Sequence, residues 1–249
     1  MPKFFIDSSC ISQNSVTLYS DDFFHLCKSL RKTEGDFITV CDKKGFDYHT
    51  RIVHIENDCA KLEILEKYPS YTELPFDVHI FQAVPKGTKM EWIIQKNTEL
   101  GVSSIIPFDS ERCVSKLSGK EEKKITRWQK ICDEAAKQSG RSTLPKIAKP
   151  LSFDEAVCAL KQHDIYFVAY EGSLNHQLKE VLLSKAPVKS IAFMVGSEGG
   201  FSPQEAAIFD EMKIPTVTLG KRILRTETAA MAISSMIIYE IGDVNQTFN

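Results

Sequence analysis

The spacing of hydrophobic and polar positions changes near residue 75. Before it, short segments alternate apolar and polar residues over positions 36–42, 48–57 and 59–67, and turn residues such as Lys44-Gly45 and Asn57-Asp58 separate them. Alternation with a period of two is typical of strands that bury one face. The pattern therefore predicts a small β-barrel or sandwich, with a short helix over residues 21–30 ahead of these strands.

After Pro75, apolar runs alternate with amphipathic segments. Runs typical of buried strands occupy residues 76–84, 102–108, 165–171, 190–196 and 214–220. Helical spacing predicts helices over residues 88–100, which Gly101 would end, and 121–139. This order predicts an α/β domain with a mostly parallel sheet covered on both faces. A linker-like stretch at residues 68–75 separates the two patterns, so we expect domains at residues 1–72 and 73–249.

Charge is distributed unevenly along the 249 residues. The formal net charge is −2, which excludes a global polycation. Residues 111–149 nevertheless hold eleven Lys and Arg against five Asp and Glu. This segment either contacts a polyanion or forms a solvated helix face, and charge alone does not decide between them.

Cysteine and histidine spacing bears on metal binding and on the cellular compartment. The seven cysteines include no C-x-x-C pair, and the six histidines show no metal-ligand spacing. We therefore expect no metal and a cytoplasmic location. Because no apolar run reaches the roughly 18 residues of a membrane span, we also expect no membrane partner.

A glycine-rich loop follows the apolar run at residues 190–196. Gly196, Gly199 and Gly200 precede Ser202, which forms a capping-box pattern with Glu205. The loop therefore lies at the carboxyl end of a strand, where ligands of open α/β sheets bind. Glycine either lets the backbone approach such a ligand or simply permits a tight turn.

A second cluster lies at residues 219–228. Lys221, Arg222 and Arg225 fall within five positions after Gly220, just ahead of a helix that is apolar almost all round. Such a helix is expected to be buried within the domain or between subunits. The cluster is either a functional site or exposed surface charge.

These two segments resemble the 16S ribosomal RNA (uracil-N3) methyltransferase family of the SPOUT superfamily. The similarity rests on residues 196–202 and 219–229 and departs at Ser197, where members usually have proline. Further similar positions run in the same order through nearly the whole chain: residues 25–31, 35–36, 86–87 and 95–102, Pro107, residues 111–112, Trp128, residues 134–139, Arg141 and residues 144–145.

The resemblance implies a fold, a reaction and partners. It implies an α/β, knotted SPOUT-type methyltransferase domain and a small N-terminal PUA-like β-barrel that binds RNA. The implied methyl donor is S-adenosylmethionine, the substrate 16S ribosomal RNA of the small ribosomal subunit, the target N3 of a specific uridine, and the assembly a homodimer.

The resemblance also assigns roles to residues. It places the donor against a set of loop residues: Tyr170, Glu171, Gly196, Ser197, Glu198, Gly199, Gly200, Leu219, Gly220, Lys221, Arg222, Ile223 and Leu224. Because the uracil imide must lose its proton, a base or a stabilising cation is required. Arg225 is the expected stabiliser, and Glu227 is either the base or only a first-turn helix carboxylate.

RNA phosphates and bases require cationic contacts. The candidates are His25, Arg31, Lys86, Lys96, Arg112 and Arg141, of which His25 is equally suited to a structural turn. Two other functions stay open on the residues alone. One is a transferase that binds a nucleotide phosphate, although no G-K-[ST] motif is present; the other is a non-enzymatic RNA-binding ribosome assembly factor.

Overall fold

The chain folds into two compact units. The computed structural model describes residues 3–12, 14–114, 121–172, 176–185 and 187–242. One unit comprises Met1–Glu73 with Ala136–Leu144, and the other comprises Leu74–Ala135 with Pro145–Asn249. The N-terminal unit thus includes a short segment from the middle of the chain, which the hydrophobic pattern placed with the second unit.

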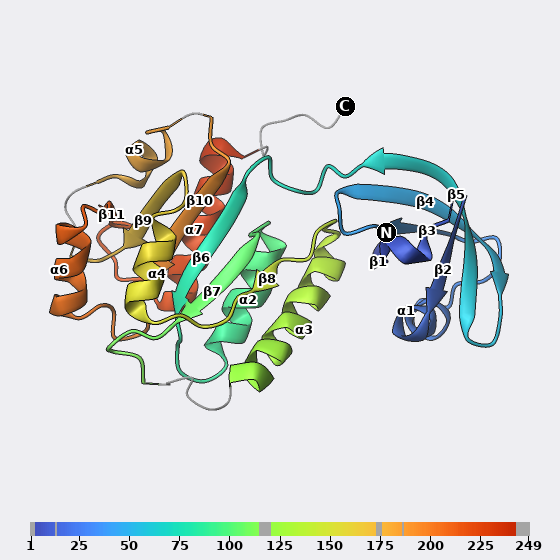
Figure 1. Cartoon of the computed structure of the whole chain (residues 1–249), viewed down its shortest axis with the longest axis horizontal. Coiled ribbons are helices and arrows are strands. Elements are labelled where there is room, and N and C mark those ends of the chain that lie inside the picture. Colours follow the sequence, from blue (N-terminus) through green and yellow to red (C-terminus); the bar gives the residue numbers. More distant parts are fainter. Residues whose placement is uncertain (1–2, 13, 115–120, 173–175, 186, 243–249) are drawn as a thin grey trace. The chain divides into compact units, whose positions relative to one another are not determined.

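The N-terminal unit is built on a curled five-stranded sheet with the order β1-β3-β4-β5-β2 (Figure 1). β1 runs parallel to β3, and the other neighbours are antiparallel. The predicted helix at residues 21–30 is confirmed as α1, which continues into a π-helical turn, η2. The elements are β1 (Lys3–Phe5), η1 (Ser8–Cys10), β2 (Ser15–Tyr19), α1 (Ser20–Phe24), η2 (His25–Ser29), β3 (Phe37–Cys41), β4 (Phe46–Ile55) and β5 (Cys59–Pro69).

Two buried ion pairs hold this unit together. Arg141 donates to Glu73 Oε2 from Nη2 at 2.6 Å and from Nε at 3.2 Å. Lys3 Nζ lies 2.7 Å from Asp47 Oδ2, and Ser142 Oγ donates to Asp47 Oδ1 at 3.0 Å. Burial opposes ionisation of Glu73, but the Arg141 guanidinium and the Ser142 N–H outweigh it and lower the pKa of Glu73. The segment Ala136–Leu144 is therefore anchored to the N-terminal strands by charge pairing inside the unit.

The second unit contains a six-stranded parallel sheet with the order β11-β9-β10-β6-β7-β8. Strands and helices alternate along the chain, as the sequence predicts. The elements are β6 (Asp77–Ala83), α2 (Lys89–Glu99), β7 (Ser104–Phe108), α3 (Glu121–Ser139), β8 (Lys146–Ile147), α4 (Phe153–Leu160), β9 (Ile165–Ala169), α5 (Leu178–Leu182), β10 (Ser190–Val195), α6 (Pro203–Glu211), β11 (Thr216–Val217) and α7 (Thr226–Ile241).

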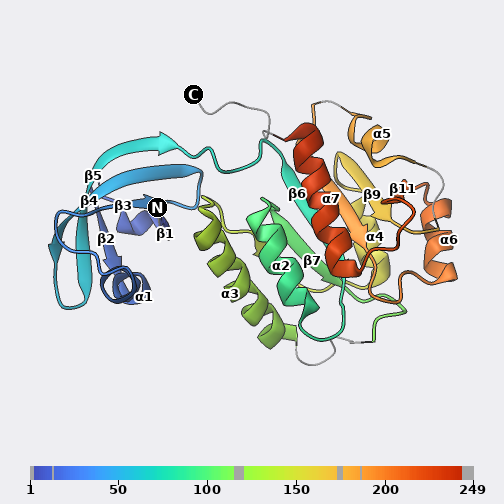
Figure 2. The ribbon, with the colours of Figure 1, turned by 180° about the vertical axis from the view of Figure 1, so that it is seen from behind.

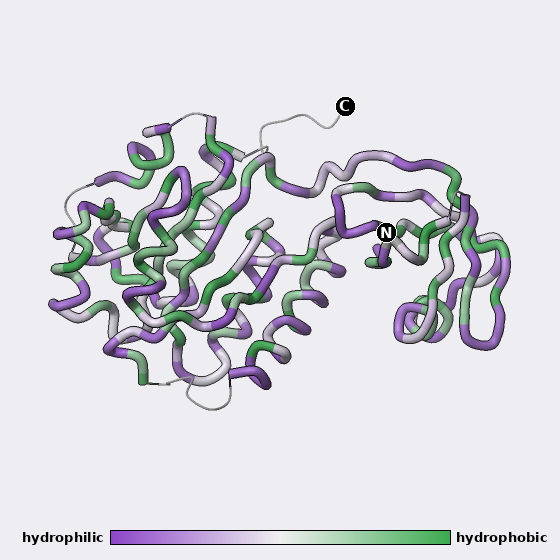
Figure 3. Tube along the Cα trace, in the orientation of Figure 1, coloured by the Kyte–Doolittle hydropathy of each residue, from purple (hydrophilic) through white to green (hydrophobic). Residues whose placement is uncertain are grey.

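Helices cover both faces of this sheet. α2, α3, α5 and α7 contribute to one apolar core, and α4 and α6 contribute to the other. α2, α3 and α7 lie in front of the sheet in Figure 2, and α4 lies in front in Figure 1. Hydrophobic and hydrophilic residues alternate along α3 in Figure 3, as expected for a helix with one buried side. The predicted α/β architecture is confirmed; the trefoil knot stays a prediction, because strand order alone does not define how a chain threads.

Local signals in the sequence account for several boundaries. Ser202 and Glu205 form a capping box at the start of α6, with Pro203 in the first turn. Gly101 follows α2 with φ +92°, the left-handed conformation of a helix end. None of the helices in the described residues is long and apolar enough to cross a membrane.

One element differs from expectation, and another narrows it. β11 contains only Thr216 and Val217, and the rest of the predicted strand leaves the sheet. It is the edge strand; it pairs with β9, and Val217 forms one isolated bridge with His176 on its other side. α7 is buried along one side only in this chain, because Met236 is 43% exposed and Tyr239 is 68% exposed. Burial of the whole helix within the domain is therefore wrong, and burial between subunits stays a prediction.

Candidate active site

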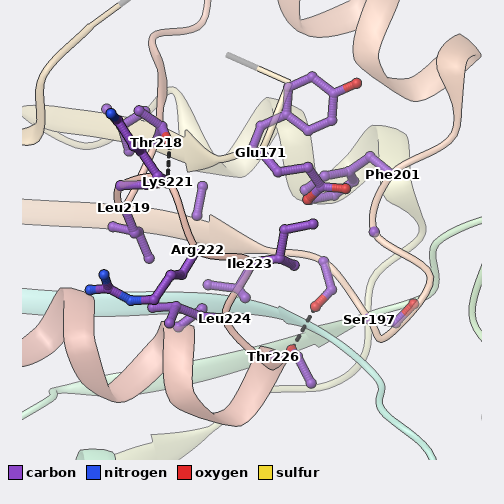
Figure 4. Close-up of a pocket in the computed structure, with 18 residues that line it drawn as sticks. Glu171, Ser197, Phe201, Thr218, Leu219, Lys221, Arg222, Ile223, Leu224 and Thr226 are labelled. Carbon is purple, nitrogen blue, oxygen red and sulfur yellow. Dashed lines mark hydrogen bonds between the residues drawn. The ribbon is translucent and has the colours of Figure 1, made fainter. Parts of the chain in front are cut away.

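A cavity of about 560 Å³ opens at the carboxyl ends of β9, β10 and β11 (Figure 4). Its walls come from three chain segments that lie far apart in the sequence. The lining residues are Ala169, Tyr170, Glu171, Val195, Gly196, Ser197, Gly200, Phe201, Val217, Thr218, Leu219, Gly220, Lys221, Arg222, Ile223, Leu224, Thr226 and Ala229. Eleven of the thirteen residues predicted to bind a cofactor are therefore brought together.

The glycine loop forms the first wall. The Gly200 N–H donates to the Ser197 carbonyl at 3.0 Å, which closes a tight turn. Gly200 has φ +63°, and a Cβ added there would lie 3.2 Å from Glu171 Oε1 across the cavity. Gly200 is therefore required for the turn and for the space beside Glu171, and the close approach of a ligand to this loop stays a prediction.

The second wall is the segment between β11 and α7, here called the 218–224 loop. Thr218 Oγ1 donates to the Gly220 carbonyl at 3.3 Å, and Gly220 has φ +105°. Ile223 is 82% exposed although it is apolar. Figure 4 shows Ile223 between Glu171 and Thr226, at the centre of the lining residues. An exposed isoleucine in a concave wall is suited to contact an apolar or aromatic ligand surface.

A buried hydrogen-bond cluster joins the roots of the two walls. Thr226 Oγ1 donates to the Gly196 carbonyl at 2.6 Å. Gln82 Nε2, from β6, donates to Thr226 Oγ1 at 2.9 Å and lies 3.4 Å from the same Gly196 carbonyl oxygen. The sequence analysis missed Gln82 and Thr226. The signal was a glutamine inside an otherwise apolar strand, where an amide must find partners.

Glu198 and Gly199 do not line the cavity. The Glu198 carboxylate accepts from the Lys86 N–H at 3.2 Å and from Lys89 Nζ at 2.7 Å. Burial opposes its ionisation, but these donors outweigh burial and lower the pKa of Glu198. Arg112 Nη1 donates to the Gly199 carbonyl at 3.0 Å. Both residues therefore fix the outer side of the glycine loop to neighbouring loops, and their cofactor role stays a prediction.

The predicted catalytic residues flank the cavity without lining it. Arg225 is the exposed residue that precedes α7, and no described side chain forms an ion pair with it. Glu227 lies in the first turn of α7, where a carboxylate favours the helix dipole. Its Oε2 is buried and has no hydrogen-bond partner among the described residues. Both are within two positions of the cavity residue Thr226.

The predicted RNA residues fall into two groups. Lys86 and Arg112 are exposed, and each forms a hydrogen bond with the glycine loop. Lys96 is half-buried and binds Glu99 within α2 at 2.8 Å.

The other three belong to the N-terminal unit. His25 and Arg31 are exposed there, and the His25 ring packs edge-on against Phe4. Arg141 is only 3% exposed and bound to Glu73, so its guanidinium has no surface to offer an RNA phosphate. The structure assigns Arg141 to the interior of its unit, which corrects the prediction.

Metal ligation has no geometric basis in the described part of the chain. No group of three or more His, Cys, Asp or Glu side chains in it is arranged to hold a metal ion.

Comparisons with known proteins identify the family. A sequence model of the RNA methyltransferase domain matches residues 72–238. The chain belongs to the RNA methyltransferase family. A model of the RNA methyltransferase PUA domain also matches residues 18–65, within the unit built on the curled sheet.

Relatives of this methyltransferase match nearly the whole chain. Ribosomal RNA small subunit methyltransferase E of Bacillus subtilis is 34% identical over 248 residues, covering 96% of this chain and 97% of that protein. The protein of the same name from Mesomycoplasma hyopneumoniae is 33% identical and covers 96% and 99%. The resemblance drawn from the motifs is thereby confirmed.

Solved structures agree in fold. Ribosomal RNA small subunit methyltransferase E of Neisseria gonorrhoeae, bound to S-adenosyl methionine, superposes with a TM-score of 0.86 at 33% identity, covering 98% of this chain and 100% of that one. A Legionella pneumophila methyltransferase in complex with SAM superposes with a TM-score of 0.83 at 26% identity, covering 97% and 98%.

Proposed function

We propose that this methyltransferase transfers a methyl group from S-adenosylmethionine to N3 of a specific uridine in 16S ribosomal RNA of the small ribosomal subunit. One observation carries the proposal. The glycine loop and the 218–224 loop face each other across a single cavity, and relatives that share the fold over nearly their whole length bind this donor.

The residues of the cavity fit the donor. A volume of about 560 Å³ lies within the range of small-molecule sites. Leu219, Ile223 and Leu224 supply apolar surface suited to an adenine ring. The Glu171 carboxylate, exposed at the end of β9, is suited to accept hydrogen bonds from ribose hydroxyls. The positive φ of Gly200 and Gly220 lets the backbone approach a ligand without a side chain in the way.

For this reaction, the protein has to orient the two reactants and stabilise the charge that develops on the uracil. Bound S-adenosylmethionine supplies a methyl group on a positively charged sulfur, which is already a good leaving group. The two loops would fix the direction from which the uracil approaches, which lowers the barrier through orientation. Arg225 would stabilise the negative charge that develops on the uracil imide as its proton leaves. Glu227 is the candidate proton acceptor, because it follows the cavity residue Thr226 in sequence and its Oε2 has no hydrogen-bond partner among the described residues.

RNA would approach over the outer side of the glycine loop. Lys86 and Arg112 are exposed cations, and both are linked to that loop by hydrogen bonds. Phosphate contacts from such residues position RNA without reading its sequence. The N-terminal unit, with its PUA match and the exposed His25 and Arg31, would bind a second part of the RNA.

The exposed side of α7 supports a homodimer. Met236 and Tyr239 lie on an apolar groove between α5 and α7, together with Leu178, Leu182 and Ala232. An exposed apolar patch on a water-facing helix is typical of a protein interface. Light scattering after size exclusion should give twice the chain mass for the wild type, and the chain mass for Tyr239→Asp. A monomeric wild type at micromolar concentration would contradict the dimer.

The methyl mark itself tests the function. Small ribosomal subunits from cells that lack this protein are incubated with the purified chain and S-adenosylmethionine, and the digested RNA is analysed by nucleoside mass spectrometry. We expect one equivalent of N3-methyluridine per 16S RNA.

Calorimetry with S-adenosylmethionine and ATP separates the alternatives. Binding of ATP alone would favour a nucleotide transferase, and binding of neither ligand with retained RNA affinity would favour an assembly factor.

A further inference from the structure

We propose that Gln82 is a positioning residue whose side-chain amide sets the separation of the two loops that hold the methyl donor. The inference rests on the proposed function, because it concerns the same cavity. Gln82 is not among the residues that line the cavity and is 0% exposed, so it acts through its neighbours and not by touching the ligand.

The hydrogen-bond pattern fixes the direction of every donor in the cluster. A threonine hydroxyl carries one hydrogen, and Thr226 gives it to the Gly196 carbonyl at 2.6 Å. Thr226 Oγ1 can then only accept from Gln82, which lies 2.9 Å away. Gln82 must therefore present its NH₂ group, and a carboxylate of the same shape cannot replace it.

The second hydrogen of Gln82 is also used. Nε2 donates to the Ala83 carbonyl at 2.9 Å, which ties the amide to the end of its own strand. One amide nitrogen thus contacts β6, the first residue of α7 and the start of the glycine loop. β6 lies beside β10 in the sheet, with Gln82 paired in register with Val195. Gln82 is therefore placed to hold the 218–224 loop, through Thr226, at a set distance from the glycine loop.

The environment of Gln82 Oε1 indicates that packing alone does not explain a glutamine at this position. Gln82 Oε1 is buried and has no hydrogen-bond partner among the described residues. A buried acceptor without a partner destabilises a fold, and an apolar side chain of similar length would avoid this. A polar residue kept at such a position is typical of a site where function requires it.

Paired substitutions separate positioning from stability. Gln82→Met keeps the length and removes the donor, whereas Gln82→Glu keeps the shape and places a negative charge against two oxygens. Thr226→Val removes the hydroxyl, and Thr226→Ser retains it. In isothermal titration with S-adenosylmethionine we expect Gln82→Met, Gln82→Glu and Thr226→Val to bind at least tenfold more weakly, and Thr226→Ser to bind within about twofold of wild type.

The kinetic readout is a split between KM and kcat. If Gln82 and Thr226 set the spacing of the loops, their substitution should raise KM for S-adenosylmethionine in the three weakened variants. Their kcat at saturating donor should fall by a smaller factor. All titrations are made well below each variant's Tm, and if a Gln82 variant does not fold, the Thr226 pair decides. Wild-type affinity in Thr226→Val, or equal losses in Thr226→Ser and Thr226→Val, would overturn the inference while leaving the proposed function intact. A wild-type chain that does not bind S-adenosylmethionine would overturn both.

Discussion

Thr226 Oγ1 donates a hydrogen bond of 2.6 Å to the carbonyl oxygen of Gly196, across thirty residues of sequence. Thr226 is the first residue of α7, and Gly196 is the first residue after β10. The bond therefore fastens together the two segments that form opposite walls of the cavity. Since the roots of the walls are fixed, a ligand in the cavity meets loops whose spacing the fold has already set, which lowers the ordering cost of binding.

Gly200→Ala should weaken donor binding. The left-handed φ of +63° and the contact with Glu171 Oε1 at 3.2 Å both oppose a Cβ. We expect a loss of about 1–2 kcal/mol in stability and about tenfold in affinity for S-adenosylmethionine. Gly45→Ala is the matched control, because Gly45 has φ +92° and nothing within 4 Å of a Cβ. It should lose similar stability and no affinity. Equal affinity of the two variants would contradict the placement of the donor.

Arg225→Ala should impair turnover and not donor binding. Arg225 is exposed and does not line the cavity, so its truncation leaves the donor's contacts in place. Removal of one group that stabilises developing charge should lower kcat by about 100-fold or more. Single-turnover methyl transfer at saturating donor measures this, and calorimetry with S-adenosylmethionine is the control. A variant that turns over at the wild-type rate would remove Arg225 from the mechanism.

Lys86 and Arg112 should differ in what their loss affects. Lys86 is linked to the glycine loop through its backbone N–H, so Lys86→Ala should lower the salt slope of RNA binding by about 1 and leave donor affinity unchanged. Arg112 reaches the Gly199 carbonyl through its guanidinium, so Arg112→Ala should weaken both RNA and donor binding. Filter binding across a salt series and calorimetry test the pair. Identical behaviour of the two variants would show that the Arg112–Gly199 bond has no role.

Arg141→Ala should destabilise the protein strongly. Removing the guanidinium leaves the Glu73 carboxylate partly buried and without its cation, which should lower the free energy of unfolding by about 3–5 kcal/mol. The double variant Arg141→Met with Glu73→Leu is the control, because it removes both charges together. In urea unfolding, the double variant should have a clearly higher free energy of unfolding than Arg141→Ala. A single variant as stable as wild type would show that the pair contributes nothing.

His163 should make stability fall in mild acid. Burial, together with the His79 ring whose centre lies 4.4 Å away, lowers the pKa of His163 to about 4. As the pH falls below 6.5, His163 takes up a proton in the unfolded chain but stays neutral in the folded chain. The free energy of unfolding is therefore highest above pH 6.5 and decreases toward pH 4. Partial exposure limits the effect to about 1–2 kcal/mol. The loss of urea midpoint between pH 7 and pH 4.5 should be smaller in His163→Gln than in wild type. An equal loss in both would contradict this assignment.

Much of the fold follows from local patterns. The helix predicted over residues 121–139 is α3 as observed, since one apolar stripe defines it over its whole length. β11 was predicted too long because hydrophobicity does not reveal which strand will be at the edge. The apolar pattern of α7 left two alternatives open, burial within the domain or between subunits, because an apolar residue gives the same signal in a core and at an interface.

The site was predictable where glycines and charges form a pattern, and not where a residue's role depends on its neighbours in space. The loops at residues 196–200 and 219–224 could be found from glycines at strand ends. The burial of Arg141 against Glu73 and the amide of Gln82 beneath Gly196 could not, because their partners lie 68 and 114 residues away. Long-range pairing of this kind is a property of the fold and leaves no periodic signal in one sequence.

The location of the donor tests the central claim most directly. A crystal of the chain grown with S-adenosylmethionine should show electron density for the ligand between the glycine loop and the 218–224 loop, beside Glu171 and Ile223. Density at another place on the protein, or an empty cavity at millimolar donor, would contradict the account.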